Sequence, residues 1–135
     1  MRRTTDSKGN TTFVEQPLVR AAKLGGFVIL DGVDRLPSST LAILSPLITD
    51  RELSLSDGSR LMRSDRYQSL VASLGQDEVT RRNIFEVKPT FRIIGLALPP
   101  NLKLGWLSEE TCSFFVLHTM PTLENVQKVD IICAV

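Results

Sequence analysis

The sequence has almost no net charge and no long apolar run. Sixteen Lys and Arg residues stand against fifteen Asp and Glu residues, so the formal net charge at pH 7 is +1. This balance removes the main electrostatic argument for nucleic acid or an anionic membrane as a general partner, and we expect no nucleic-acid binding. The longest apolar runs, at residues 27–30 and 93–100, are far shorter than the roughly 18 residues that span a bilayer. We therefore expect no membrane-spanning segment.

Cysteine is also scarce. Cys112 and Cys133 are the only cysteines, which excludes a framework of several disulfides. A single bridge between them is one alternative, and two buried free thiols are the expected state. Together with His118 they lack the paired spacing that is typical of a zinc site. We therefore expect packed side chains at these positions rather than metal ligands.

The chain is long enough for one ordinary domain, with 135 residues. Apolar residues make up 42% of the sequence and charged residues 23%, which is the composition of a globular protein. Residues 1–12 are polar and show no periodic pattern. We expect a disordered or frayed N-terminus there, followed by a single domain over residues 13–135.

A helix and a short apolar strand begin this domain. From Phe13 the apolar residues recur at helical spacing, Pro17 suits the first helical position, and Gly25-Gly26 ends the helix. Residues 27–30 are all apolar, which predicts a strand buried on both faces, and residues 91–98 predict a second strand of the same kind. Helices that alternate with such strands indicate an α/β fold with a mainly parallel sheet.

The middle of the chain predicts a helix and a hairpin. The helix follows Pro37, is capped by Ser38 or Ser39, and is expected to kink at Pro46. Alternation over residues 52–62, interrupted by Asp57-Gly58, predicts a β-hairpin with a two-residue turn that projects from the sheet. Beyond it we expect charged helices over residues 63–82 with a break at Gly75, a loop over 101–111, a short strand or buried turn at 114–117, and a helix from about residue 123.

Asp31 is the first candidate functional residue. It directly follows the apolar strand at residues 27–30. In open α/β sheets ligands lie beyond the carboxyl ends of the strands, so a carboxylate at this point is placed to hold a hydrated Mg²⁺ beside the phosphates of a nucleotide. The alternative is a loop carboxylate that caps the next turn.

The order of elements resembles a known family. A helix, the strand with Asp31, a helix, a hairpin, an apolar strand and a proline are similar to the second half of an AAA+ ATPase core of the MoxR or dynein-like type. In that core the Walker B strand is followed by a helix, a hairpin and the sensor 1 strand. The segments that carry the resemblance are residues 16–22, 29–35, 50–61, 63–67 and 91–100, and the likeness covers about residues 12 to 130.

The resemblance implies a partial P-loop NTPase fold with a β-hairpin inserted before the sensor 1 strand. It implies ATP and Mg²⁺ as cofactors of the intact module, with Asp31 as the magnesium residue. It also implies neighbouring AAA+ modules or subunits as partners, in a ring or tandem array. The resemblance extends to a large mitochondrial protein with tandem AAA+ modules, of which this chain would be a fragment.

Several side chains that an active AAA+ site uses are absent from these 135 residues. The loop Gly-x-x-x-x-Gly-Lys-Ser/Thr, which binds the phosphates, does not occur among them. Gly32 stands at the position of the Walker B glutamate that orients the attacking water. Asp34 is a weak catalytic candidate in its place, and a helix-entry or turn carboxylate is the alternative interpretation. Leu98 stands at the sensor 1 position, where the family usually has Asn, and it cannot hydrogen-bond to water or phosphate.

The arginine residues are the remaining candidates for functional groups. No arginine follows Arg92, so no arginine finger follows the sensor 1 position. Arg51 is a candidate for serving a neighbouring subunit, and the alternatives are solvation or pairing with Asp50 or Glu52. The cluster of Arg60, Arg63 and Arg66 is interleaved with acidic residues, so a solvated face is expected first and a subunit contact second.

These observations lead to one functional hypothesis and two alternatives. The chain is predicted to be a fragment of an AAA+ module that binds Mg-ATP and couples the nucleotide state to remodelling of a partner. Because Gly32 and Leu98 replace hydrolytic groups, hydrolysis in this module is expected to be poor, and the chain alone is expected to be inactive. The alternatives are a degenerate AAA+ segment that forms a subunit interface, and a non-enzymatic α/β adaptor that holds a partner through the hairpin.

Overall fold

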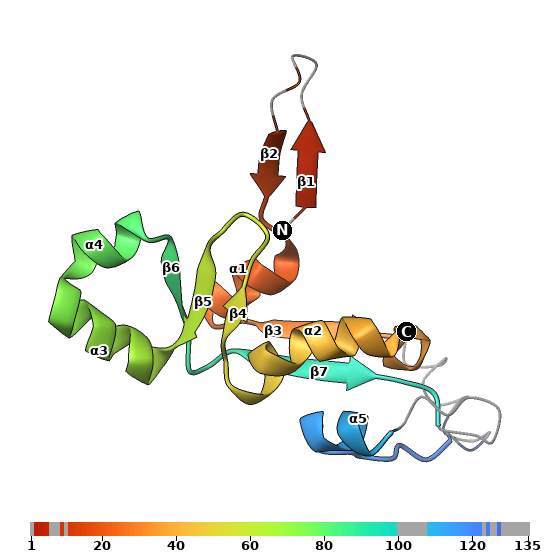
Figure 1. The fold of residues 1–135 in the computed structure, drawn as a ribbon. Helices are drawn as coiled ribbons and strands as arrows, with labels where there is room; N and C mark the ends of the chain where they lie inside the picture. Colours follow the sequence, from red (N-terminus) through yellow and green to blue (C-terminus); the bar gives the residue numbers. More distant parts are fainter. Residues whose placement is uncertain are drawn as a thin grey trace.

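The fold is a small α/β arrangement, seen in a computed structural model that describes residues 2–5, 9, 11–99, 108–122, 124 and 127 (Figure 1). The expected α/β class is confirmed. The described strands form three small sheets, in the orders β1-β2, β3-β7 and β4-β5-β6. The elements are β1 (Arg2–Thr5), β2 (Thr11–Val14), α1 (Pro17–Leu24), β3 (Phe27–Asp31), the 3₁₀ turn η1 (Val33–Arg35), α2 (Ser38–Thr49), β4 (Leu53–Ser54), β5 (Arg60–Arg63), α3 (Ser64–Leu74), α4 (Gln76–Arg81), β6 (Ile84–Val87), β7 (Arg92–Leu96) and α5 (Glu109–Phe114).

Strands β3 and β7 form a parallel pair, as the two apolar runs predicted. Ile29 lies opposite Ile94, and the register brings the carboxyl ends of both strands together. The expected burial on both faces is wrong. Val28 and Ile93 pack against the core, whereas Phe27 is 73% exposed and Ile29 is 62% exposed. The reason is that successive strand residues point to opposite faces, and the described part of the chain covers only one of them.

Helix α1 begins and ends where the sequence predicted. Pro17 is its first residue, and Gly25 ends it with a left-handed backbone at φ 81°. The amides of Gly25 and Gly26 both donate to the carbonyl of Ala21. The Oγ1 of Thr90 donates to the carbonyl of Gly25 at 3.0 Å, so the end of the helix is also joined to the segment before β7.

Gly25→Ala is expected to lower the free energy of unfolding by about 1–3 kcal/mol. A Cβ at this position would lie 2.1 Å from the Oγ1 of Thr90, and the positive φ adds backbone strain. Chemical denaturation followed by circular dichroism measures the loss. Gly58→Ala is the matched control, because Gly58 has φ +83° but no atom within 4 Å of its added Cβ. An equal loss in both variants would show that the contact with Thr90 contributes nothing.

The hairpin is confirmed, although its turn is longer than expected. In β4 and β5, Leu53 lies opposite Leu61 in antiparallel register. The amide of Leu55 donates to the carbonyl of Ser59, so three residues form the loop rather than two. Gly58 lies in the left-handed region at φ 83°, as a three-residue hairpin loop with a bulge requires.

Strand β6 has no counterpart in the sequence prediction. It pairs in parallel with β5, so the hairpin belongs to a three-stranded sheet and does not simply project from the β3–β7 pair (Figure 1). The segment has only four residues, although Ile84, Phe85 and Val87 are residue types that are common in strands. Pairing with β5 and packing of Val87 in the core both stabilise it.

The core lies where α1, α2, β5 and β6 meet the start of β7. Gly75 separates α3 from α4, as the sequence predicted. In α2 the expected helix is confirmed and contains Pro46. Pro37 occupies its N-cap position and no side chain caps the helix, so the expected cap by Ser38 or Ser39 is wrong. The buried cluster consists of Val19, Ala22, Leu47, Leu61, Val87 and Phe91.

Other predictions differ from the structure near the two ends of the chain. Instead of an irregular N-terminus, β1 and β2 form an exposed antiparallel hairpin, in which Thr4 lies opposite Thr12 and their hydroxyls are hydrogen-bonded. Helix α5 ends at Phe114 and Val116 is fully exposed, so the short strand or buried turn at 114–117 is wrong. Cys112 and His118 are exposed, so the expected packing of these two side chains is wrong.

Some expectations fall outside the described residues, namely most of the loop over 101–111, the helix from about residue 123, and Cys133. The division of the chain at residue 12 stays a prediction. Among the described residues, no helix has the length and apolar content that crossing a membrane requires.

Candidate functional site

Asp31 lies at the carboxyl end of the parallel strand pair. It is the last residue of β3 and sits opposite Leu96, the last residue of β7. The amide of Gly32 then donates to the carbonyl of Leu96 at 2.9 Å. The Asp31 side chain is exposed, so its carboxylate is open to a ligand at the edge where α/β sheets bind them.

Gly32 has a backbone conformation that favours glycine. Its φ is +76°, in the left-handed region. A Cβ at this position would lie 2.4 Å from the Nη2 of Arg35 and 2.6 Å from its Nε. The guanidinium of Arg35 therefore lies directly beside Gly32, the predicted position of the Walker B glutamate.

Arg35 is a residue that the sequence reasoning did not single out. It is exposed and closes the short turn η1 after Asp31. The available signal was its place at the end of residues 29–35, one of the segments that carried the family resemblance. A guanidinium four residues after Asp31, the predicted magnesium ligand, is a suitable group for a phosphate oxygen.

Asp34 and Leu98 are brought into contact. The backbone amide of Leu98 donates to Oδ1 of Asp34 at 3.3 Å, and Asp34 is only 9% exposed. This bond joins η1 to the segment that follows β7. It agrees with the alternative interpretation of Asp34 as a turn carboxylate, and a catalytic role for Asp34 stays a prediction. Leu98 is 64% exposed, and its side chain has no polar atom; its place at the sensor 1 position stays a prediction.

The donor set fits a magnesium ion only when phosphates complete its coordination. Mg²⁺ is usually bound through one or two carboxylates together with phosphates and water. Asp31 supplies one such carboxylate. Within the described ranges no group of three or more His, Cys, Asp or Glu side chains could hold a metal ion alone. Asp31 therefore fits a nucleotide-bound magnesium better than a metal site made only of protein.

Arg51 does not join the Asp31 site of its own chain. Its Nη1 donates to the carbonyl of Phe91 at 2.5 Å, next to the first residue of β7. Asp31 lies beside the last residue of that strand, about 13 Å away along a strand of this length. The role of Arg51 toward a neighbouring subunit stays a prediction.

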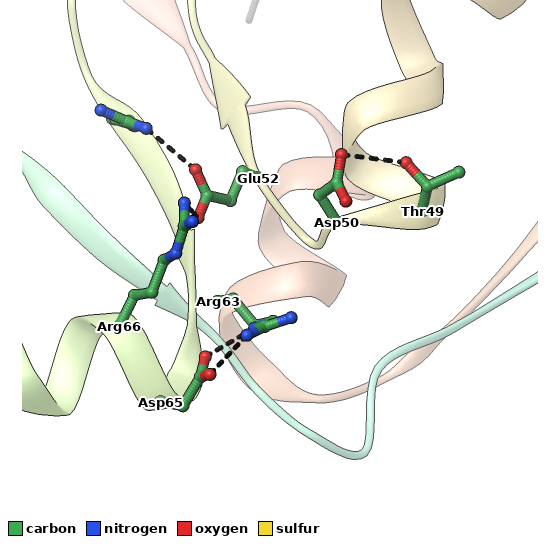
Figure 2. Close-up of polar contacts among 7 residues, drawn as sticks. Thr49, Asp50, Glu52, Arg63, Asp65 and Arg66 are labelled. Carbon is green, nitrogen blue, oxygen red and sulfur yellow. Dashed lines mark hydrogen bonds and ion pairs between the residues drawn. The ribbon is translucent and has the colours of Figure 1, made fainter.

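The alternative in which Arg51 pairs with Asp50 or Glu52 is wrong, because those carboxylates have other partners. Glu52 binds Arg60 at 2.9 Å and Arg66 at 2.8 Å (Figure 2). Burial raises the pKa of Glu52, but the hydrogen bonds from these two arginines outweigh it, and the pKa lies below its ordinary value. Asp50 accepts a hydrogen bond from Thr49.

Arg63 is held by Asp65 through both carboxylate oxygens (Figure 2). The hydrogen bond from Arg63 lowers the pKa of Asp65 to about 2. All three clustered arginines are therefore paired with acidic neighbours, with Glu52 shared by Arg60 and Arg66, which agrees with a solvated face. Exposed pairs of this kind add little to stability.

Comparisons with known proteins agree with this geometry. Residues 1–115 match the model of the AAA domain family, dynein-related subfamily. The chain is 44% identical over 135 residues to the mouse von Willebrand factor A domain-containing protein 8, covering 96% of this chain but only 7% of that protein. No solved structure matches. The expected family is confirmed: the chain belongs to the dynein-related AAA domain family of AAA+ ATPases.

Proposed function

We propose that this chain forms the Walker B and sensor 1 part of an AAA+ module that binds Mg-ATP. The observation that carries the proposal is the edge of the β3–β7 pair, where the exposed Asp31 and the residues after β7 lie together. AAA domains bind nucleotide as a family, and the position of Asp31 is the one at which α/β sheets receive ligands. Asp31 would hold the magnesium, and Arg35 would contact a phosphate oxygen.

Hydrolysis at this site is proposed to be poor. Phosphoryl transfer depends on a positioned water and on stabilised charge. Gly32 has no side chain to orient that water, and Leu98 has no polar atom to contact it. The module would therefore bind nucleotide and retain it.

The nucleotide state is proposed to act on a partner through neighbouring AAA+ modules in a ring or tandem array. The chain spans 7% of its mouse relative, so the activity of the whole protein and a mitochondrial location are proposals as well. A purely structural role as a subunit interface is the second candidate, because Phe27, Ile29 and Ile94 leave one face of the β3–β7 pair apolar and exposed. The adaptor role of the hairpin is less favoured, since Leu61 is fully buried in the core.

The test is a titration of Mg-ATP into the chain joined to a phosphate-binding loop. We expect Asp31→Ala to weaken magnesium-dependent binding about tenfold or more, because it removes a charged ligand of the ion. Isothermal titration with and without Mg²⁺ measures the effect. Asp77→Ala, an exposed acidic residue on α4, is the control and should bind as the parent does.

Two results would contradict the proposal. One is binding that does not distinguish Asp31→Ala from Asp77→Ala. The other is tight, stoichiometric ATP binding by the 135-residue chain alone, because the amides and Lys that bind the phosphates are not among these residues. Ring assembly that persists without nucleotide would favour the structural alternative.

A further inference from the structure

Two guanidinium groups meet at one backbone carbonyl on the side of the molecule away from Asp31. The Nη1 of Arg51 lies 2.5 Å from the carbonyl oxygen of Phe91, and the Nη1 of Arg92 lies 2.8 Å from the same oxygen. The Nη1 of Arg92 also donates to the carbonyl of Pro89 at 2.6 Å. One neutral oxygen therefore accepts hydrogen bonds from two positive side chains.

Neither arginine has a counter-charge in the part of the chain that the structure describes. The ion pairs there engage other cations, including Arg63 with Asp65 and Lys88 with Glu86. Burial, and then the positive charge of Arg92, lower the pKa of Arg51. Like charges held this close repel each other, and an anion between them would remove the repulsion.

The two arginines line a cleft of about 360 Å³. Arg63 and Lys88 flank them, while Asp65 is the acidic residue of the lining and is bound to Arg63. Most lining residues are exposed, so the cleft is shallow. Val87 and Pro89 form its apolar lining. It lies at the amino end of β7, whereas the nucleotide site lies at the carboxyl end.

We propose that this cleft binds an acidic segment of a protein partner, with a carboxylate of the segment placed between Arg51 and Arg92. Arginine has five N–H donors in a planar fork that matches a carboxylate, and each of these arginines uses only Nη1 in the contacts with Phe91 and Pro89. An extended segment suits the cleft better than a free ion, because a shallow site leaves a small anion solvated. Further carboxylates of the segment would lie near Arg63 and Lys88, and an apolar side chain would lie on the exposed ring of Pro89.

The experiment uses a short fluorescent peptide of Asp, Glu and one Leu, and a matched peptide in which Asn and Gln replace the acids. Fluorescence anisotropy with the 135-residue chain is expected to show binding of the acidic peptide only. Arg92→Gln is expected to weaken that binding about tenfold, because it removes charge-assisted hydrogen bonds from an exposed side chain. Arg51→Gln is expected to weaken it at least as much.

Arg81→Gln is the matched control, because Arg81 is an exposed arginine on α4 outside the cleft and is paired with Glu78. It should leave the affinity unchanged. Circular dichroism verifies that each variant is folded, and if Arg51→Gln is unfolded, Arg92→Gln decides the outcome alone. Equal losses in Arg81→Gln and Arg92→Gln would overturn the proposal as unspecific charge attraction.

Competition separates the sources of the anion. Inorganic phosphate and Mg-ATP are each added to the peptide complex at matched ionic strength. Displacement only at concentrations far above that of the peptide agrees with an acidic segment as the ligand. Displacement by either competitor at the concentration of the peptide would overturn the proposal in favour of a phosphate site. The absence of any peptide binding would also overturn the proposal. The peptide assay needs no nucleotide, so its outcome is independent of the proposed Mg-ATP site.

Discussion

Phe91→Ala is expected to lower the free energy of unfolding by about 3–5 kcal/mol. Phe91 is fully buried in the cluster that joins α1, α2, β5 and β6, so truncation leaves a cavity that several elements share. The loss is large beside the roughly 5–15 kcal/mol of a typical domain, and the open face of the β3–β7 pair leaves this chain with less burial than usual. We expect cooperative unfolding to be nearly lost.

Urea denaturation followed by circular dichroism measures this effect. Phe13→Ala is the matched control, because Phe13 is 40% exposed in β2, outside the core cluster. Its loss should be much smaller. Equal losses in the two variants would mean that the cluster around Phe91 does not hold the fold together. An unfolding midpoint of Phe91→Ala that equals that of the parent would lead to the same conclusion.

The second large effect concerns hydrolysis at the proposed nucleotide site. With a phosphate-binding loop supplied, single-turnover hydrolysis is expected to be about a hundredfold or more slower than in an AAA+ module with a Walker B glutamate. The reason is the pair of missing groups at Gly32 and Leu98. Fast hydrolysis by the parent that is indifferent to Asp31→Ala would mean that the chemistry lies elsewhere and that Asp31 is only a turn residue.

Gly32→Glu is expected to raise the rate only in part. The substituted residue would have φ near +76°, which costs about 1–2 kcal/mol, and its Cβ would meet the guanidinium of Arg35. Arg35 would also attract the new carboxylate away from the water. The double variant Gly32→Glu/Arg35→Ala removes both contacts and should be faster than Gly32→Glu, while Leu98 still limits both. Single-turnover rates of the four proteins, with Arg35→Ala alone as the control, measure the difference.

The sequence by itself determined the elements that depend on local signals. Pro17 and Gly25 define the ends of α1, because one lacks an amide and the other accepts a left-handed backbone. Asp57-Gly58 indicated the hairpin, and the apolar runs indicated β3 and β7. The order of these elements, with Asp31 after the first strand, was sufficient to predict the family that the comparisons show.

The tertiary structure alone decided which distant residues meet and which surfaces stay open. Asp34 meets Leu98 across 64 residues, and Arg51 meets Phe91 across 40. Strand β6 pairs in parallel with β5 although α3 and α4 separate the two strands in the sequence. A run of apolar residues shows that a strand prefers burial, but whether both of its faces are buried depends on what other segments pack there. Such contacts come from the packing of whole elements, which no local pattern of side chains encodes.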